Sequence, residues 1–63
     1  MTTGEIIKQR REALGIEQKA MAEELGITPS MLCQIERGTK MVTMPLAKKI
    51  SYMLECTIDE LAG

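Results

Sequence analysis

The stretch of residues 18–38 constrains the fold more than any other part of this chain. Three apolar residues in its first part recur at the spacing of one helical face: Met21, Ala22 and Leu25. This spacing predicts a short amphipathic helix over about residues 18–25. Gly26 follows directly, where the end of a helix favours a residue that adopts positive φ. We therefore expect a sharp turn at Gly26 and expect the rest of the chain to support this stretch.

A second helix is predicted directly after this turn. Thr28 is a favourable N-cap, and Pro29 suits the first helical position, where its missing N–H has no cost. Leu32 and Ile35 share the inner face of this helix, which we expect over about residues 29–36. Two short helices joined by a glycine turn are the signature of the helix-turn-helix motif, whose second helix enters the major groove of DNA.

A first helix is predicted before this motif. Thr2 and Glu5 have the spacing of a capping box, and the helix is expected to run to about Leu14. Ile7 and Leu14 lie two turns apart and are expected to share its buried face, before Gly15 ends the helix in a left-handed conformation. Three polar residues are expected to face solvent: Lys8, Gln9 and Glu12.

Two further helices are predicted after the motif. Thr43 is a candidate N-cap for the fourth helix, whose apolar stripe consists of Leu46, Ile50 and Leu54. Thr57 and Glu60 form a second capping box that starts a short fifth helix. No segment alternates apolar and polar residues with a period of two. The expected fold is therefore all-α, a compact five-helix domain that occupies residues 1–63 as a single unit.

Arg11 lies on the apolar face of the predicted first helix. Its stem could be buried while its guanidinium reaches water, as long cationic side chains often do. We favour a second interpretation, in which Arg11 forms a structural ion pair with Glu36, because Glu36 follows Ile35 on the inner side of the third helix. Such a pair would hold the first helix against the third.

The charge of the chain is distributed unevenly. The formal net charge is −1, which is not typical of a nucleic-acid-binding protein. However, residues 26–49 carry four cationic side chains against one carboxylate, and residues 50–63 carry only carboxylates. Phosphate binding depends on local cations more than on the total charge, so the basic middle of the chain is compatible with DNA binding.

Several classes of function are disfavoured by composition. The chain has no histidine, and its cysteines, Cys33 and Cys56, do not have the spacing of metal ligands. We expect no metal, no cofactor and no catalytic activity, because no nucleophile and base are paired and no glycine-rich phosphate loop is present. No apolar run approaches the roughly 18 residues of a membrane span, so we expect no membrane association and a cytoplasmic location.

The chain resembles the lambda-repressor-like helix-turn-helix family, which includes domains of phage Cro and repressor proteins and is also called xenobiotic-response-element-like. The resemblance covers essentially the whole chain. The matching residues are Gly15, Ile16, Gln18, Ala22, the run Leu25–Thr28, Leu32, the run Ile35–Gly38 and the run Ile58–Leu61. This resemblance implies a five-helix fold that binds double-stranded DNA.

The resemblance also implies roles for individual residues. Bases of the major groove would be contacted by Pro29, Ser30, Cys33 and Gln34. Phosphates would be contacted by Gln18, Thr28, Arg37, Thr39, Lys40 and Thr43. Gln34 is the strongest candidate for reading sequence, because its amide can form two hydrogen bonds with adenine.

Three residues depart from the usual pattern of the family. Glu17 adds a negative charge beside the expected phosphate contact, and Pro29 and Cys33 replace more polar residues on the third helix. Readout of sequence would then depend partly on methyl contacts and DNA shape. Cys33 is expected to act as a small apolar group, although an exposed thiol there could also act as a redox switch. Cys56 is expected to be buried.

The resemblance implies a sequence-specific, DNA-binding transcription regulator, and we expect a repressor that binds as a homodimer. A dimer would read two half-sites about 34 Å apart. Its expected interface lies around Tyr52, Met53, Cys56 and Leu61. The alternative is a protein-interaction module of the same fold, similar to an antitoxin or antirepressor and with weak DNA binding. The methionines are expected chiefly to fill the core, and the alternative is that Met41, Met44 and Met53 form part of an exposed patch where a regulatory protein partner docks.

Overall fold

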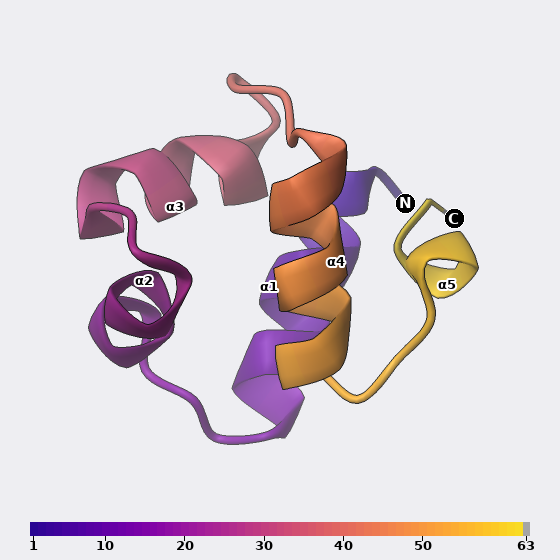
Figure 1. The fold of residues 1–63 in the computed structure, drawn as a ribbon, viewed down its shortest axis with the longest axis horizontal. Coiled ribbons are helices and arrows are strands. Elements are labelled where there is room, and N and C mark those ends of the chain that lie inside the picture. The colour runs from indigo at the N-terminus through magenta and orange to yellow at the C-terminus, as the bar shows by residue number, and fades with distance from the viewer. Residues whose placement is uncertain (63) are drawn as a thin grey trace.

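The computed structural model describes residues 1–62, which form five α-helices. The helices are α1 (Thr3–Ala13), α2 (Gln18–Leu25), α3 (Pro29–Arg37), α4 (Met44–Met53) and α5 (Ile58–Ala62). Figure 1 shows α2 and α3 together on one side of the molecule and α5 on the opposite side, with α1 and α4 between them. The predicted all-α, five-helix fold is confirmed. Helix α3 ends one residue later than predicted.

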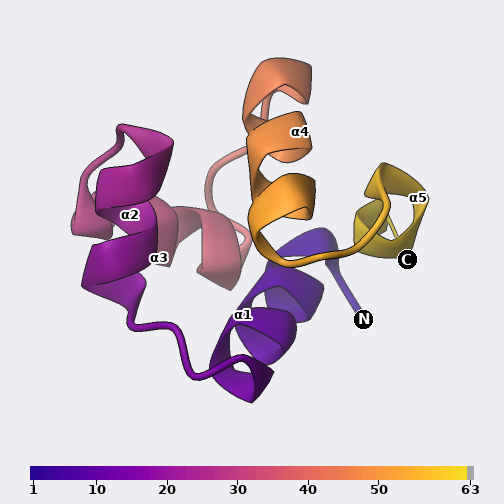
Figure 2. The same cartoon turned by 60° about the horizontal axis from the view of Figure 1, so that its bottom comes forward.

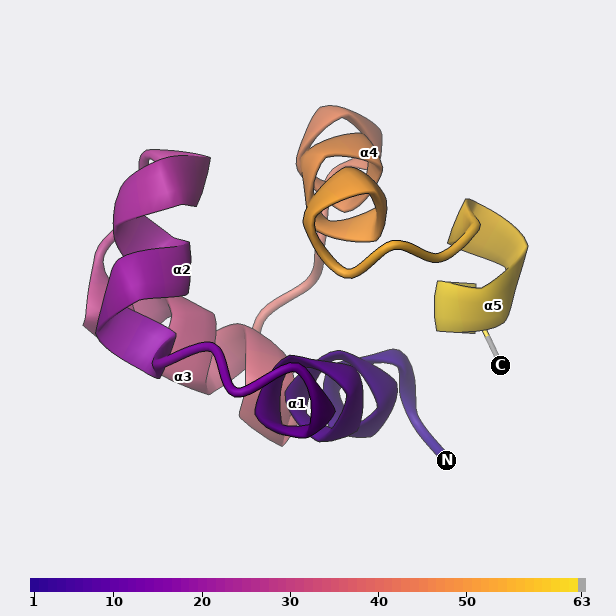
Figure 3. The ribbon, with the colours of Figure 1, turned by 90° about the horizontal axis from the view of Figure 1, so that it is seen from below.

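Helix α3 is the element on which the packing depends most. It contacts both α1 and α2, and α5 contacts α1 and α4 on the other side of the molecule. Figures 2 and 3 show α3 lying between α2 and α1 in two further views. The second helix of the motif is therefore supported along its inner side by two helices from different parts of the chain.

Capping side chains fix where three of the helices begin. In the Thr2 and Glu5 capping box of α1, the Thr2 N–H donates to Glu5 at 2.9 Å and the Glu5 N–H donates to the Thr2 hydroxyl at 3.2 Å. Thr57 and Glu60 make the same two bonds before α5, at 2.9 and 3.1 Å. The Thr28 hydroxyl accepts from the backbone N–H of Met31 at 3.1 Å, which caps α3.

The predicted N-cap of α4, Thr43, is confirmed. Thr43 occupies the N-cap position with an extended backbone, but within residues 1–62 its side chain makes no capping hydrogen bond. An N-cap side chain accepts from the N–H of the second or third helical residue, and Pro45, the second residue of α4, has no N–H to donate. Thr43 is exposed, and its hydroxyl is free to bind another group.

One apolar core holds the five helices together. Its buried members are Ile7, Met21, Ala22, Leu25, Leu32, Ile35, Ile50, Leu54 and Leu61. The expectation that Leu14 shares the buried face of α1 was wrong, because its side chain is 46% exposed. Helix α1 ends at Ala13, and Leu14 is its C-cap, so its side chain lies past the last helical residue. Gly15 adopts the predicted left-handed conformation after it.

Gly4 brings α1 into close contact with the end of α3. A Cβ atom on Gly4 would overlap the backbone oxygen of Ile35 and would lie 2.6 Å from that of Glu36. Only a residue without a side chain permits this approach, and the sequence pattern did not reveal it. The close contact places the first turn of α1 directly beside Glu36.

The turn between α2 and α3 has the predicted geometry. Gly26 is the C-cap of α2 with φ of 75°, and Ile27 is half-buried against the core. This left-handed residue ends α2 and redirects the chain into the Thr28 cap within three residues. Among the described residues, no helix is long and apolar enough to cross a membrane.

Candidate nucleic-acid interface

Helix α3 presents two different faces. Leu32 and Ile35 are buried in the core, whereas the residues predicted to contact bases lie on the outer side. We call this outer side the groove face, which consists of Pro29, Ser30, Cys33 and Gln34. Three of its members are exposed, and Cys33 is half-buried. Ser30 and Gln34 are one helical turn apart, so both side chains can enter the same groove.

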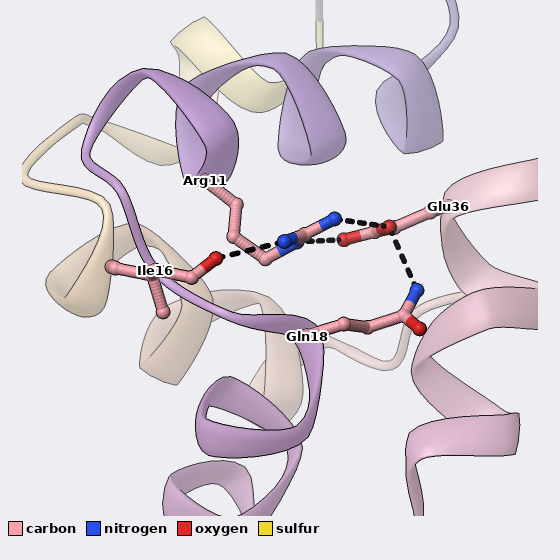
Figure 4. A network of polar contacts seen from close by, with 4 residues as sticks. All are labelled: Arg11, Ile16, Gln18 and Glu36. Atoms are coloured by element: carbon pink, nitrogen blue, oxygen red, sulfur yellow. Dashed lines mark hydrogen bonds and ion pairs between the residues drawn. The ribbon is translucent and has the colours of Figure 1, made fainter.

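A buried ion pair joins α1 to α3, as the sequence predicted. Arg11 Nε donates to Glu36 Oε2 at 2.7 Å, and Arg11 Nη2 donates to Glu36 Oε1 at 3.2 Å (Figure 4). The third donor, Nη1, reaches the backbone oxygen of Ile16 at 2.8 Å in the loop before α2. Hydrogen bonding to Glu36 raises the pKa of Arg11, which therefore remains charged. Both side chains are more than nine-tenths buried.

Gln18 extends this network to the start of α2. Its Nε2 donates to Glu36 Oε1 at 3.1 Å (Figure 4). The amide predicted to contact phosphate is thus held by α3, while its second N–H and its oxygen stay available. Within residues 1–62, Glu17 gives α2 no side-chain cap, so the positive end of the helix is not occupied by its own N-cap side chain.

The other predicted phosphate contacts lie at both ends of α3. Thr28 begins the helix, and Arg37 lies in its last turn with an exposed side chain. Thr39, Lys40 and Thr43 are exposed in the loop that leads to α4. The Thr39 hydroxyl donates to the backbone oxygen of Gln34 at 3.2 Å, which holds this loop close to the groove face.

A cleft of about 530 Å³ opens where α1, α2 and α3 meet. Its lining residues are Thr2, Glu5, Lys8, Gln18, Cys33, Glu36 and Arg37. The cleft brings together three of the residues predicted to contact DNA. It also contains Lys8, for which the sequence suggested only exposure to solvent. The available signal was its position three residues before Arg11, which places both side chains on neighbouring parts of one helix surface.

The surface expected to form a dimer differs from the prediction. Leu61 is 2% exposed and belongs to the core, so it was wrongly included in an interface. Tyr52 is 88% exposed, and Met53 and Cys56 are half-buried beside it. Cys56 was expected to be buried, but it is only half-buried against the core. Its remaining burial raises the pKa of the Cys56 thiol, which keeps the thiol protonated at neutral pH.

The two short helices joined at Gly26, with a supported inner face and an exposed outer face on α3, define a helix-turn-helix protein. A family model described as helix-turn-helix matches residues 7–61. The chain therefore belongs to the helix-turn-helix family. The match leaves out only residues 1–6, which include the first turn of α1, and residues 62–63.

The similar proteins include named regulators. The cryptic phage CTXphi transcriptional repressor RstR of Vibrio cholerae is 36% identical over 63 residues, which are the whole of this chain and 56% of RstR. The P22 c2 repressor, solved with a synthetic operator, is 30% identical with a TM-score of 0.90, and the match covers 97% of this chain and 92% of that one. The resemblance to phage repressors is thereby confirmed.

Two other solved structures show how widely the fold occurs. SinR, a master regulator of biofilm formation solved in complex with DNA, is 28% identical with a TM-score of 0.89 over 98% of this chain and all of that chain. Hydroxypropylphosphonic acid epoxidase from S. wedmorenis is 29% identical with a TM-score of 0.88 over 97% of this chain, but the match covers only 32% of the epoxidase. The P22 c2 repressor and SinR, by contrast, are matched over 92% and 100% of their chains.

Proposed function

We propose that this chain is a sequence-specific, double-stranded DNA-binding transcription regulator whose α3 enters the major groove. The observation that carries the proposal is the exposed groove face of α3, which the Arg11–Glu36 pair holds rigidly against the rest of the molecule. The P22 c2 repressor and SinR, which share this fold, were both solved with DNA. The proposal gives the chain no catalytic role and places it in the cytoplasm, where it would reach DNA.

Base reading would fall mainly to Ser30 and Gln34. Both can hydrogen-bond to base edges, whereas Pro29 and Cys33 offer apolar contact with thymine methyl groups. Phosphate contacts from Gln18, Thr28, Arg37, Thr39, Lys40 and Thr43 would flank these bases and fix the register of α3. The outer side of α3 carries few polar readers, so we expect DNA shape to contribute to the choice of site.

Repression by a homodimer is the form of regulation that we propose. RstR is named a transcriptional repressor, and this chain spans about half of its length. One domain of this size reads only one half-site, so a second copy would supply the remaining affinity and specificity. Tyr52, Met53 and Cys56 are the accessible members of the expected interface, on a face that α3 does not occupy.

A protein-interaction module remains the alternative function. Its supporting observation is the exposure of Met41 and Met44, at 90% and 57%, near the loop before α4. Exposed methionines adapt easily to different partners. Met53 is only half-buried and lies at the other end of α4, so it does not complete one continuous patch with them.

Selection of bound duplexes from a random pool at physiological salt tests the proposed function. Enrichment of a palindrome with half-sites about 34 Å apart is the expected result, because a two-fold dimer imposes its symmetry on the DNA. Enrichment of a single half-site would support sequence-specific DNA binding and contradict the proposed homodimer. If no sequence is enriched, the protein-interaction alternative takes its place.

A further inference from the structure

We propose that Lys8 of α1 is a further phosphate-contacting residue, and that the cleft between α1, α2 and α3 receives a backbone phosphate of bound DNA. This inference rests on the proposed function, because the phosphate belongs to the duplex that α3 enters. It adds a DNA contact from a helix outside the helix-turn-helix motif.

The position of Lys8 is the first argument. It lines the cleft of about 530 Å³ together with Gln18 of α2 and Arg37 of α3. Cys33, a member of the groove face, lines the same cleft. A DNA strand that passes the groove face would therefore run along the mouth of the cleft, with cationic or amide groups from three helices around it.

The charges around the cleft are the second argument. Glu36 also lines it, but its carboxylate is bound by Arg11 at 2.7 Å, so its charge is compensated. Glu5 remains negatively charged, and its carboxylate accepts from the backbone N–H of Thr2 at the start of α1. The uncompensated groups are then two cations, Lys8 and Arg37, against one exposed carboxylate. Such a balance favours an anion.

The availability of the Lys8 ammonium is the third argument. Within residues 1–62, neither Lys8 nor Arg37 forms an ion pair. The neighbouring Arg10, in contrast, pairs with Glu60 of α5 at 2.9 Å and is directed to the opposite side of α1. Lys8 is exposed, and its flexible stem allows the ammonium to follow a phosphate into the cleft.

A salt titration of Lys8→Ala tests this contact, with Lys49→Ala as the matched control. Lys49 is also an exposed helical lysine, but it lines a separate cavity between α2 and α4. The probe is a mixed-sequence duplex of about 30 base pairs, long enough for two half-sites one helical turn apart. Thermal melts of both variants verify that the fold is retained.

Lys8→Ala should reduce the magnitude of the slope of log affinity against log salt by about 1.8, because a dimer loses one phosphate contact in each half-site and each contact on B-DNA contributes about 0.9. Its binding defect should consequently shrink about 12-fold between about 50 and 200 mM salt. Lys8→Arg should restore the wild-type slope, and Lys49→Ala should leave it unchanged. The same defect is expected on any duplex sequence, because a phosphate carries no sequence information.

Equal slopes for Lys8→Ala and the wild-type protein would overturn the assignment of Lys8 and leave the proposed function intact. An equal loss in Lys49→Ala would also overturn it, since the effect would then be one of general charge. A wild-type protein that binds no duplex at any salt concentration would overturn the proposed function and this contact together.

Discussion

At the scale of single residues, the Arg11–Glu36 pair decides how α3 is held. The guanidinium donates three hydrogen bonds, two to the carboxylate oxygens and one to the Ile16 backbone, and the carboxylate also accepts from Gln18. Within residues 1–62, no buried side-chain polar atom lacks a partner. Removal of either charge would leave the other buried and uncompensated, which is more costly than absence of the pair.

Glu36→Gln should lower the free energy of unfolding by about 3 kcal/mol, because it leaves the buried Arg11 charge without its counter-ion. Urea denaturation at neutral pH measures the change. Glu12→Gln, which removes an exposed carboxylate on α1, is the matched control and should change little. An unchanged unfolding midpoint in Glu36→Gln would show that the pair contributes nothing to holding α3.

Gln34→Ala should relax sequence preference at one base pair and cost about 1–3 kcal/mol on the best duplex, because it removes two hydrogen bonds to a base. Binding to random duplexes should be nearly unaffected. Lys40→Ala provides the contrast, since loss of a phosphate contact weakens all duplexes equally. Competition binding with the selected duplex and with random duplexes distinguishes the two variants. If Gln34→Ala lost the same affinity for the selected duplex as for random duplexes, Gln34 would not read a base.

At the scale of elements, the positions where the helices begin were more predictable than the contacts of the side chains at their ends. Both capping boxes and the Gly26 turn depend on two to four neighbouring residues, so local sequence specifies them. Leu14 is exposed because α1 ends just before it. In the part of the chain that the structure describes, Thr43 makes no capping hydrogen bond, because Pro45 lacks one of the N–H groups that it could accept from. The Gly4 contact was unpredictable for a different reason, because its partner lies on another helix.

Glu55 ends α4 in a conformation that glycine adopts more easily. It is the one non-glycine residue with positive φ among residues 1–62, at 55°. The left-handed conformation costs an L-residue roughly 1–2 kcal/mol, and the extra flexibility of unfolded glycine offsets part of this. Glu55→Gly should therefore raise the free energy of unfolding by about 0.5–1 kcal/mol in urea denaturation. Gly26→Ala, the reverse change, should lower it, and stabilisation by that variant would refute the argument.

The two capping boxes should make stability depend on pH in acid. Backbone hydrogen bonds from Thr2 and Thr57 are the largest causes that lower the pKa of Glu5 and of Glu60 below the ordinary value of 4.5. A carboxyl whose pKa is lower in the folded state contributes stability above 4.5, and this is lost as pH falls through the folded pKa. Unfolding midpoints should decline below about pH 4.5. The double variant Glu5→Gln and Glu60→Gln should flatten that decline, and an identical decline would contradict this origin.

At the scale of the whole molecule, residues from distant parts of the chain meet at the site. The groove face was predictable because one helix supplies it and its spacing is visible in the sequence. The Arg11–Glu36 pair was predictable because a charge on an apolar stripe needs a partner. Helical periodicity places Lys8 near Arg11, but it does not show that α1, α2 and α3 together form a cleft beside Lys8, because that depends on how the helices are oriented.

The central claim is that DNA binds the side of the molecule formed by α3, the start of α2 and the loop after α3. Amide chemical shifts measured by NMR during titration with the selected duplex test it directly. The account predicts the largest changes at Gln18, Ser30, Gln34 and Lys40, with α5 least affected by direct contact. Changes concentrated around Tyr52 and Met53, with α3 unaffected, would contradict it.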